Sequence, residues 1–263
     1  MDIETKSELL ERLKEIEKWE NDQKGLWFWE KLGRLPFLLL DKITPKFIHE
    51  KIGQGIDEIV TYVQSGGSYL VDQESVLKKH FPNEVLILEE VCDLEISKMD
   101  KAASQITQKR AKTAMLQGGT TGIGGIFTLA IDVPLMFGIT LKTLQEIAIC
   151  YGYNPLDKAE RIFTVKCLQF VSSDIVGKKA ILDDLIEFDN KENSQMISQI
   201  QGWREVLMTY RDNMGWKKLF QMIPIAGIIF GAYINKSTVN ETAEVAMMLY
   251  RKRRILDRLG KLL

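Results

Sequence analysis

The stretch AMLQGGTTGIGGIFTLAIDVPLMFGITLKTLQEIAICYGYN, residues 114–154, decides the fold class of this chain. No charged side chain stands between Lys112 and Asp132, and none from Val133 to Leu141. The apolar residues lack the strict alternation that marks a half-buried β-strand. We therefore expect a helical segment at the centre of the protein.

A second apolar segment, LFQMIPIAGIIFGAYIN at residues 219–235, is also free of charged side chains. Its Gly227 and Gly231 stand four residues apart, as Gly118 and Gly122 do in the first segment. On an α-helix this spacing places both glycines on one face, so that a partner helix can approach closely. Each glycine costs a helix about 1 kcal/mol relative to alanine, and close backbone packing offsets that cost. We expect the two segments to pack on each other as a tight pair.

Both apolar segments are marginal for a helix that crosses a bilayer, which needs about 20 predominantly apolar residues. The first contains Gln117 among threonines and glycines, and the second contains Gln221. Three interpretations stay open: buried core helices, shallow membrane insertion, and helices that span the membrane. The residues that we assign to helix packing or membrane contact in these segments are Gly118, Gly119, Gly122, Gly125, Pro134, Pro224, Gly227 and Gly231.

The rest of the chain is a series of amphipathic patterns with apolar residues three and four apart. They predict helices over 3–24, 45–64, about 82–116, from Asn154-Pro155 onward, within 178–217 and over about 238–260. The prediction is an all-α, multi-helix bundle with the two glycine-rich apolar helices packed centrally. We divide it into an N-terminal amphipathic helix with an aromatic connector, residues 1–44, and a helical domain, residues 45–263.

Composition argues against several classes of function. The formal net charge is −1, with 35 basic and 36 acidic side chains, so there is no global basic field to hold nucleic acid. The two histidines and three cysteines show no metal-ligand spacing, and we expect no metal and no cofactor. GGTTGIGG, residues 118–125, lacks the lysine and the preceding strand of a phosphate loop. The acidic, amphipathic N-terminus is unlike a signal peptide, which predicts a cytoplasmic protein.

Asp132 and Glu146 are the acidic residues of the central segment. A carboxylate in apolar surroundings can serve as a general acid or base. Lys142 stands four residues before Glu146, so the two can pair on one helix face. A soluble hydrolase that uses Asp132 and Glu146, with Lys142 beside them, is one alternative. The structural alternative, which we prefer, makes Asp132 the N-cap of a new helix and Glu146 the partner of Lys142.

Two groups of residues suit a membrane surface. Trp27 and Trp29 stand in GLWFWEKLGRLPFLLLDKITPKF, residues 25–47, where aromatic, leucine and cationic side chains mix. A basic cluster near the C-terminus could contact anionic headgroups. It consists of Arg251, Lys252, Arg253 and Arg254. The alternatives are a buried aromatic connector for the tryptophans and a solvated helix face for the basic cluster.

Three blocks of the sequence, residues 42–60, 118–168 and 223–253, together resemble the EcsC family. The resemblance implies a transport or envelope context, because the family takes its name from a bacterial protein encoded beside an ABC transport system linked to secretion. It implies no reaction. Lys142 stands where we would expect an arginine in the family pattern. Positions that match the pattern are Gly118, Gly119, Gly122, Gly125, Asp132, Pro134, Glu146, Tyr151, Gly152, Pro224, Gly227, Gly231 and Asn235.

We therefore expect a noncatalytic, membrane-peripheral helical accessory protein linked to ABC transport or secretion. Its partner would be the inner membrane surface or an ABC transporter, and no nucleic acid. Its place would be the cytoplasm or the cytoplasmic face of the membrane. Besides the hydrolase, the other alternative is a soluble helical module that binds a protein partner. The sequence indicates no oligomeric state.

Overall fold

The computed structural model describes residues 4–24, 61–67, 70–82, 84–85, 87–121, 126–172, 175–188 and 224–261. Within these ranges the chain is helical or connects helices, and none of it lies in a β-strand. This confirms the prediction of an all-α, multi-helix protein. The helices are α1 (Lys6–Lys24), α5 (Gln73–His80), the 3-10 helix η2 (Leu88–Asp93), α6 (Ile96–Thr121), α7 (Ile126–Cys150), α8 (Lys158–Ser172), α9 (Ile175–Ile186) and α12 (Pro224–Lys261).

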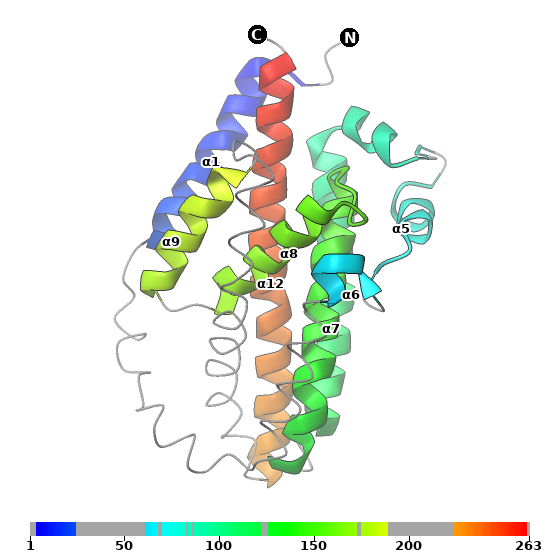
Figure 1. Ribbon diagram of the computed structural model, residues 1–263, viewed down its shortest axis with the longest axis vertical. Helices are drawn as coiled ribbons and strands as arrows, with labels where there is room; N and C mark the ends of the chain where they lie inside the picture. The colour runs from blue at the N-terminus through cyan, green and yellow to red at the C-terminus, as the bar shows by residue number, and fades with distance from the viewer. Residues whose placement is uncertain are drawn as a thin grey trace.

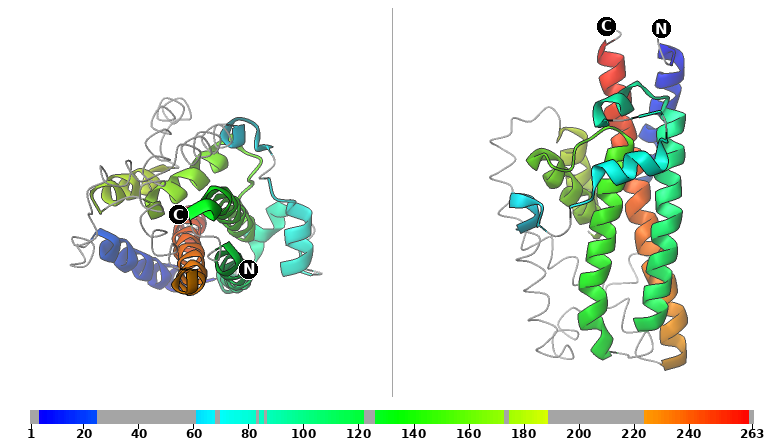
Figure 2. Two further views of the ribbon diagram at one scale, coloured as in Figure 1. Left: turned by 90° about the horizontal axis from the view of Figure 1, so that it is seen from below. Right: turned by 90° about the vertical axis from the view of Figure 1, so that its right-hand side faces the viewer.

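Three long helices, α6, α7 and α12, lie side by side and form the centre of the molecule (Figures 1 and 2). The two chain termini lie at one end of this bundle, which we call the terminal end. The opposite end, which we call the far end, contains the end of α6 and the starts of α7 and α12. Helix α12 therefore runs antiparallel to α6 and places its apolar segment at the far end.

Glycine brings α6 and α12 into backbone contact near the far end. A Cβ atom added to Gly118 would lie 2.1 Å from the carbonyl oxygen of Gly231 and 2.8 Å from Nδ2 of Asn235. Each of the two apolar segments therefore contributes one glycine to this crossing. Gly122 and Gly125 lie outside the described residues, whereas Gly227 lies in α12, one turn before Gly231.

Two predicted helix boundaries in the long helices are wrong. Helix α7 runs without a break through Asp132 and Pro134, so Asp132 does not cap a new helix. Packing of α7 against α6 and α12 outweighs the roughly 3 kcal/mol that an interior proline costs. The second apolar segment and the C-terminal amphipathic pattern join in the single helix α12, which begins at Pro224. Proline is well suited to the first position of a helix, where its missing N–H is not needed.

Two other helices begin later than the sequence predicts. The pattern over 82–116 is interrupted at Leu94, which is extended, and α6 begins only at Ile96. Residues Asn154 and Pro155 form a turn in which Oδ1 of Asn154 accepts a hydrogen bond from the Leu156 N–H at 3.0 Å. The asparagine thus stabilises a local turn, as Asx residues often do, and α8 begins at Lys158.

The shorter helices lie around the bundle, with α1 and α9 on one side and α5 on the other (Figures 1 and 2). Helix α8 contacts α7, α9 and α12, while α1 packs against α9 and α12. Helix α5 packs on α7. The core between them is apolar and includes the buried aromatic residues Tyr62, Tyr151, Phe163, Phe170 and Tyr250.

Gly152 ends α7 in a conformation that favours glycine, with φ at 77°. The Gly152 N–H bonds to the carbonyl of Ile149, and the Tyr153 N–H bonds to that of Ala148, both at 3.0 Å, as in a Schellman motif. A Cβ at Gly152 would lie 3.0 Å from Arg254 Nη2 and 3.0 Å from Cys92 Sγ.

We expect Gly152→Ala to destabilise the protein by about 1–3 kcal/mol, because alanine is strained at positive φ and crowds these two side chains. Urea denaturation followed by circular dichroism measures the change. Gly260→Ala is the matched control, since an added Cβ at Gly260 meets nothing within 4 Å. Equal stability of both variants and the parent protein would contradict the expectation.

Candidate functional site

Glu146 is held by an arginine from the neighbouring helix. Arg110 on α6 donates from Nε and Nη2 to the two carboxylate oxygens, at 2.7 and 2.6 Å. This planar, two-bond pairing explains why Glu146 does not pair with Lys142, as the sequence predicted. The carboxylate therefore serves as a link between α6 and α7.

Asp132 and Glu146 are too far apart to share an acid–base site. Both lie on α7, separated by fourteen positions, which corresponds to about 21 Å along a helix axis. Paired carboxylates in glycosidases, for comparison, stand roughly 5–9.5 Å apart. Helix α7 therefore does not bring these two residues together as one acid–base pair. The described residues also contain no group of three or more histidine, cysteine, aspartate or glutamate side chains placed to hold a metal ion.

The side chains of the basic cluster of α12 contact other parts of the protein. Neighbouring residues on a helix point about 100° apart, so four consecutive cations reach in four directions. Arg251 Nε lies 2.9 Å from Asp100 Oδ1 on α6, and Lys252 Nζ lies 2.7 Å from Glu20 Oε1 on α1. These ion pairs contradict the prediction that the cluster faces lipid, because its charge is neutralised within the chain. Trp27 and Trp29 lie outside the described residues.

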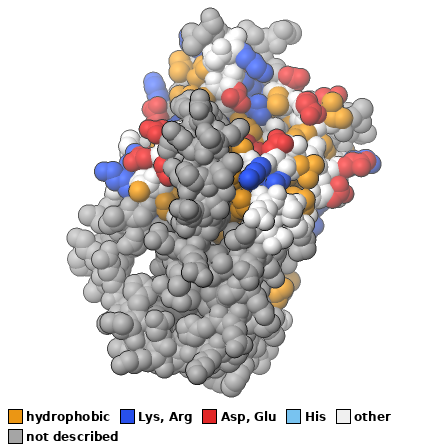
Figure 3. All heavy atoms as spheres, viewed as in Figure 1, with side chains coloured by type: hydrophobic (Ala, Val, Ile, Leu, Met, Phe, Trp, Pro, Cys, Tyr) orange, Lys and Arg blue, Asp and Glu red, His pale blue; other side chains and the backbone are white. Residues whose placement is uncertain are grey.

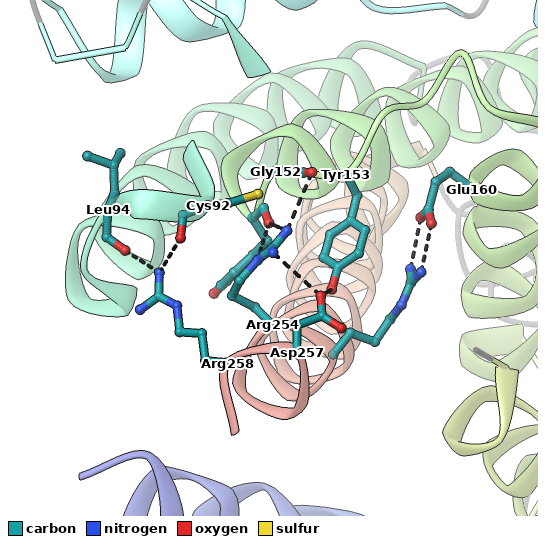
Figure 4. A network of polar contacts seen from close by, with 10 residues as sticks. Cys92, Leu94, Gly152, Tyr153, Glu160, Arg254, Asp257 and Arg258 are labelled. Atoms are coloured by element: carbon teal, nitrogen blue, oxygen red, sulfur yellow. Dashed lines mark hydrogen bonds and ion pairs between the residues drawn. The ribbon is translucent and has the colours of Figure 1, made fainter. Parts of the chain in front are cut away.

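Arg253 contacts both an acidic side chain and aromatic rings. Its Nη1 and Nη2 donate to the two oxygens of Glu160 on α8, at 2.9 and 2.7 Å (Figure 4). The guanidinium carbon also lies 4.1 Å from the ring centre of Tyr153 and 4.5 Å from that of Phe163. The arginine thus satisfies its charge by a two-bond ion pair and by contact with aromatic faces.

Arg254 and Arg258 bind backbone carbonyls at the terminal end. Arg254 donates from Nε and Nη2 to the carbonyl of Tyr151, at 2.9 and 2.7 Å, just after the end of α7. Arg258 donates to the carbonyls of Cys92 and Leu94 beside η2 (Figure 4). The network therefore connects α7, η2, α8 and α12, and we interpret it as structural.

At the far end, each of the three central helices exposes a large apolar side chain. Leu116 on α6 is 67% exposed, and Leu135 on α7 is 49% exposed. On α12, Ile229 is 70% and Tyr233 is 68% exposed. We call these four residues the far-end apolar surface. On the face drawn in Figure 3, charged and apolar side chains of the described residues are mixed in the upper half, toward the terminal end.

The sequence predicted that these segments are apolar, but it could not divide their residues between core and surface. Gly118, Gly231 and Asn235 are buried where α6 meets α12, whereas Leu116, Ile229 and Tyr233 point outward. Among the described helices, none combines the length and the apolarity needed to cross a membrane.

Comparison with known proteins identifies the family of this chain. The EcsC protein family matches residues 10–255, so the chain belongs to the EcsC family. The chain is 52% identical to Uncharacterized protein YdbA of Bacillus subtilis (strain 168), over 98% of its own length and 97% of that protein. It is 24% identical to Protein EcsC of the same strain, over 82% and 83% of the two chains. No solved structure matches the chain significantly.

Proposed function

We propose that this EcsC-family protein is a noncatalytic accessory protein that docks peripherally on the cytoplasmic face of a membrane. The observation that carries the proposal is the far-end apolar surface, Leu116, Leu135, Ile229 and Tyr233, contributed by three different helices at one end of the bundle. Single exposed apolar residues are normal on a protein, whereas large ones from three helices around one end of a bundle suit the entry of that end into lipid.

The sequence of the two segments favours lipid as the contact. The described start of α12 carries no charge from Pro224 to Asn235, and the end of α6 carries none beyond Lys112. A shallow insertion of such ends would bury the exposed leucine, isoleucine and tyrosine side chains among acyl chains and headgroups. The transport or secretion role, with an ABC transporter as a neighbour on the same membrane, rests on the family resemblance and is part of this proposal.

The test is binding to lipid vesicles by co-sedimentation. We expect the parent protein to bind and the triple variant Leu116→Gln, Ile229→Gln, Tyr233→Gln to bind at least about tenfold more weakly, because each buried apolar side chain contributes up to about 1.5–3 kcal/mol. The matched control is Leu156→Gln combined with Leu256→Gln, which alters exposed leucines away from the far end.

The control variant is expected to bind like the parent protein. Absence of binding by the parent protein would refute the proposal. In that case, co-purification of one specific protein, lost in the far-end triple variant, would support the soluble protein-binding module in its place. Equal loss of vesicle binding in the far-end and control variants would also refute the assignment of this surface.

A further inference from the structure

Each of the three central helices carries a lysine just behind its exposed apolar residue, on the side away from the far end. On α6, Lys112 lies four residues before Leu116. On α12, Lys236 follows Tyr233 by three residues, and on α7, Lys142 follows Leu135 by seven. With a rise of 1.5 Å per residue, each lysine lies about 5–10 Å behind the apolar side chain of its helix.

The three lysines also lie at one level of the bundle. The contact between Gly118 and Gly231 and the ion pair between Asp100 and Arg251 fix the register of α6 against α12. This register places Lys236 beside the stretch of α6 around residue 115. The ion pair between Arg110 and Glu146 likewise places Lys142 beside residue 114 of α6. Lys112, Lys142 and Lys236 thus fall within about 5 Å along the axis, and we call them the lysine band.

The charges of the lysine band are available for an outside partner. Lys112 and Lys236 are exposed and Lys142 is half-buried, and none of the three forms an ion pair with an acid of the described residues. The cations of the terminal end are different, since Arg251, Lys252 and Arg253 are each paired with an acid in the chain.

A second pair of lysines extends the positive charge one turn behind the band. Lys79 on α5 lies next to Lys109 on α6, and this contact lowers the pKa of Lys79 from its usual value. Two adjacent ammonium groups repel each other, so an anion placed between them would be stabilised. At a similar level, Glu241 of α12 is an exposed acid, and its Oε1 accepts a hydrogen bond from Ser237 at 2.9 Å.

We propose that the lysine band lies at the headgroup level of a membrane that carries anionic phospholipids, while the far-end apolar surface enters the region below the headgroups. The inference rests on the proposed function and adds to it a lipid class and an orientation, with the bundle axis pointing into the membrane. Lysines suit this level because their ammonium groups reach phosphates while their methylene stems lie on apolar surroundings.

The experiment compares vesicles of phosphatidylcholine alone with vesicles that also contain phosphatidylglycerol. We expect the parent protein to bind the anionic vesicles at least tenfold more tightly, because one lysine near an anionic surface contributes roughly a factor of five. The triple variant Lys112→Gln, Lys142→Gln, Lys236→Gln is expected to lose this preference and to keep its binding to neutral vesicles.

Two further variants serve as controls. The triple variant Lys101→Gln, Lys158→Gln, Lys261→Gln makes the same change in net charge at exposed lysines away from the far end, and it is expected to keep the preference. Arginine at the three band positions retains the charge and is expected to restore the preference. Unfolding of the glutamine variant would show in circular dichroism, and the arginine and control variants would then decide the question.

The outcomes separate the two proposals. Equal binding of the parent protein to neutral and anionic vesicles would overturn the lysine band while leaving peripheral docking intact. Equal loss in the band variant and the charge-matched control would also overturn it, since net charge alone would then explain the preference. A parent protein that binds neither kind of vesicle would refute the proposed function itself.

Discussion

Replacing Gly118 by alanine is expected to destabilise the protein by about 3 kcal/mol or more, at the upper end of the cost of overpacking. The added Cβ would lie 2.1 Å from the carbonyl oxygen of Gly231 and 2.5 Å from its carbonyl carbon. Both atoms belong to the backbone of α12, so no side-chain rotation can relieve the overlap. The two helices would have to separate along much of their shared length.

Gly119→Ala is the control for this prediction, because it makes the same change one residue further along α6. An added Cβ there meets Cβ of Ala232 at 3.8 Å, an ordinary van der Waals contact. Alanine is favoured over glycine inside a helix by about 1 kcal/mol, so this variant should be as stable as the parent protein or slightly more stable. Urea denaturation measures both. A Gly118→Ala protein with unchanged stability would show that α6 and α12 do not touch at these glycines.

The glycine spacing predicted a close helix contact; the structure shows Gly118 against the backbone of Gly231, whereas Gly122 lies outside the described residues. What the spacing could not reveal is the register, which depends on contacts between residues far apart in the chain. The ion pairs of Asp100 with Arg251 and of Arg110 with Glu146 belong to this class. No local pattern indicates which of the many acids and bases of the sequence will meet.

The basic cluster illustrates a second limit of structure prediction from the sequence. A run of four cations was interpreted as one surface patch, although consecutive helix positions cannot share a face. The angular spacing of helix positions alone predicts that the four cations make separate contacts, and this prediction could have been made from the sequence. The identity of the partners, Asp100, Glu20 and Glu160, could not be predicted, because each comes from another helix. The boundary errors at Pro134 and Asn154 arise similarly, since tertiary packing and a local turn outweighed the cap signals.

Loss of the Glu160 charge is expected to destabilise the protein by about 3–5 kcal/mol, the cost of breaking a buried ion pair by removing one of its two charges. In Glu160→Gln, the guanidinium of Arg253 would stay enclosed by aromatic rings with one neutral amide in place of a carboxylate. The side chains of Arg253 and Glu160 are only 10% and 9% exposed, so water cannot replace the lost partner. Thermal and urea denaturation measure the loss.

Glu74→Gln provides the exposed comparison. Glu74 pairs with Lys78 on α5, where both side chains are more than half exposed, and such exposed pairs contribute little to stability. The double variant Glu160→Leu, Arg253→Met should be more stable than Glu160→Gln, because it removes both buried charges and keeps apolar volume beside Phe163. If Glu160→Gln cost no more than Glu74→Gln, the arginine would have access to solvent. The link between α8 and α12 would then contribute little to the stability of the bundle.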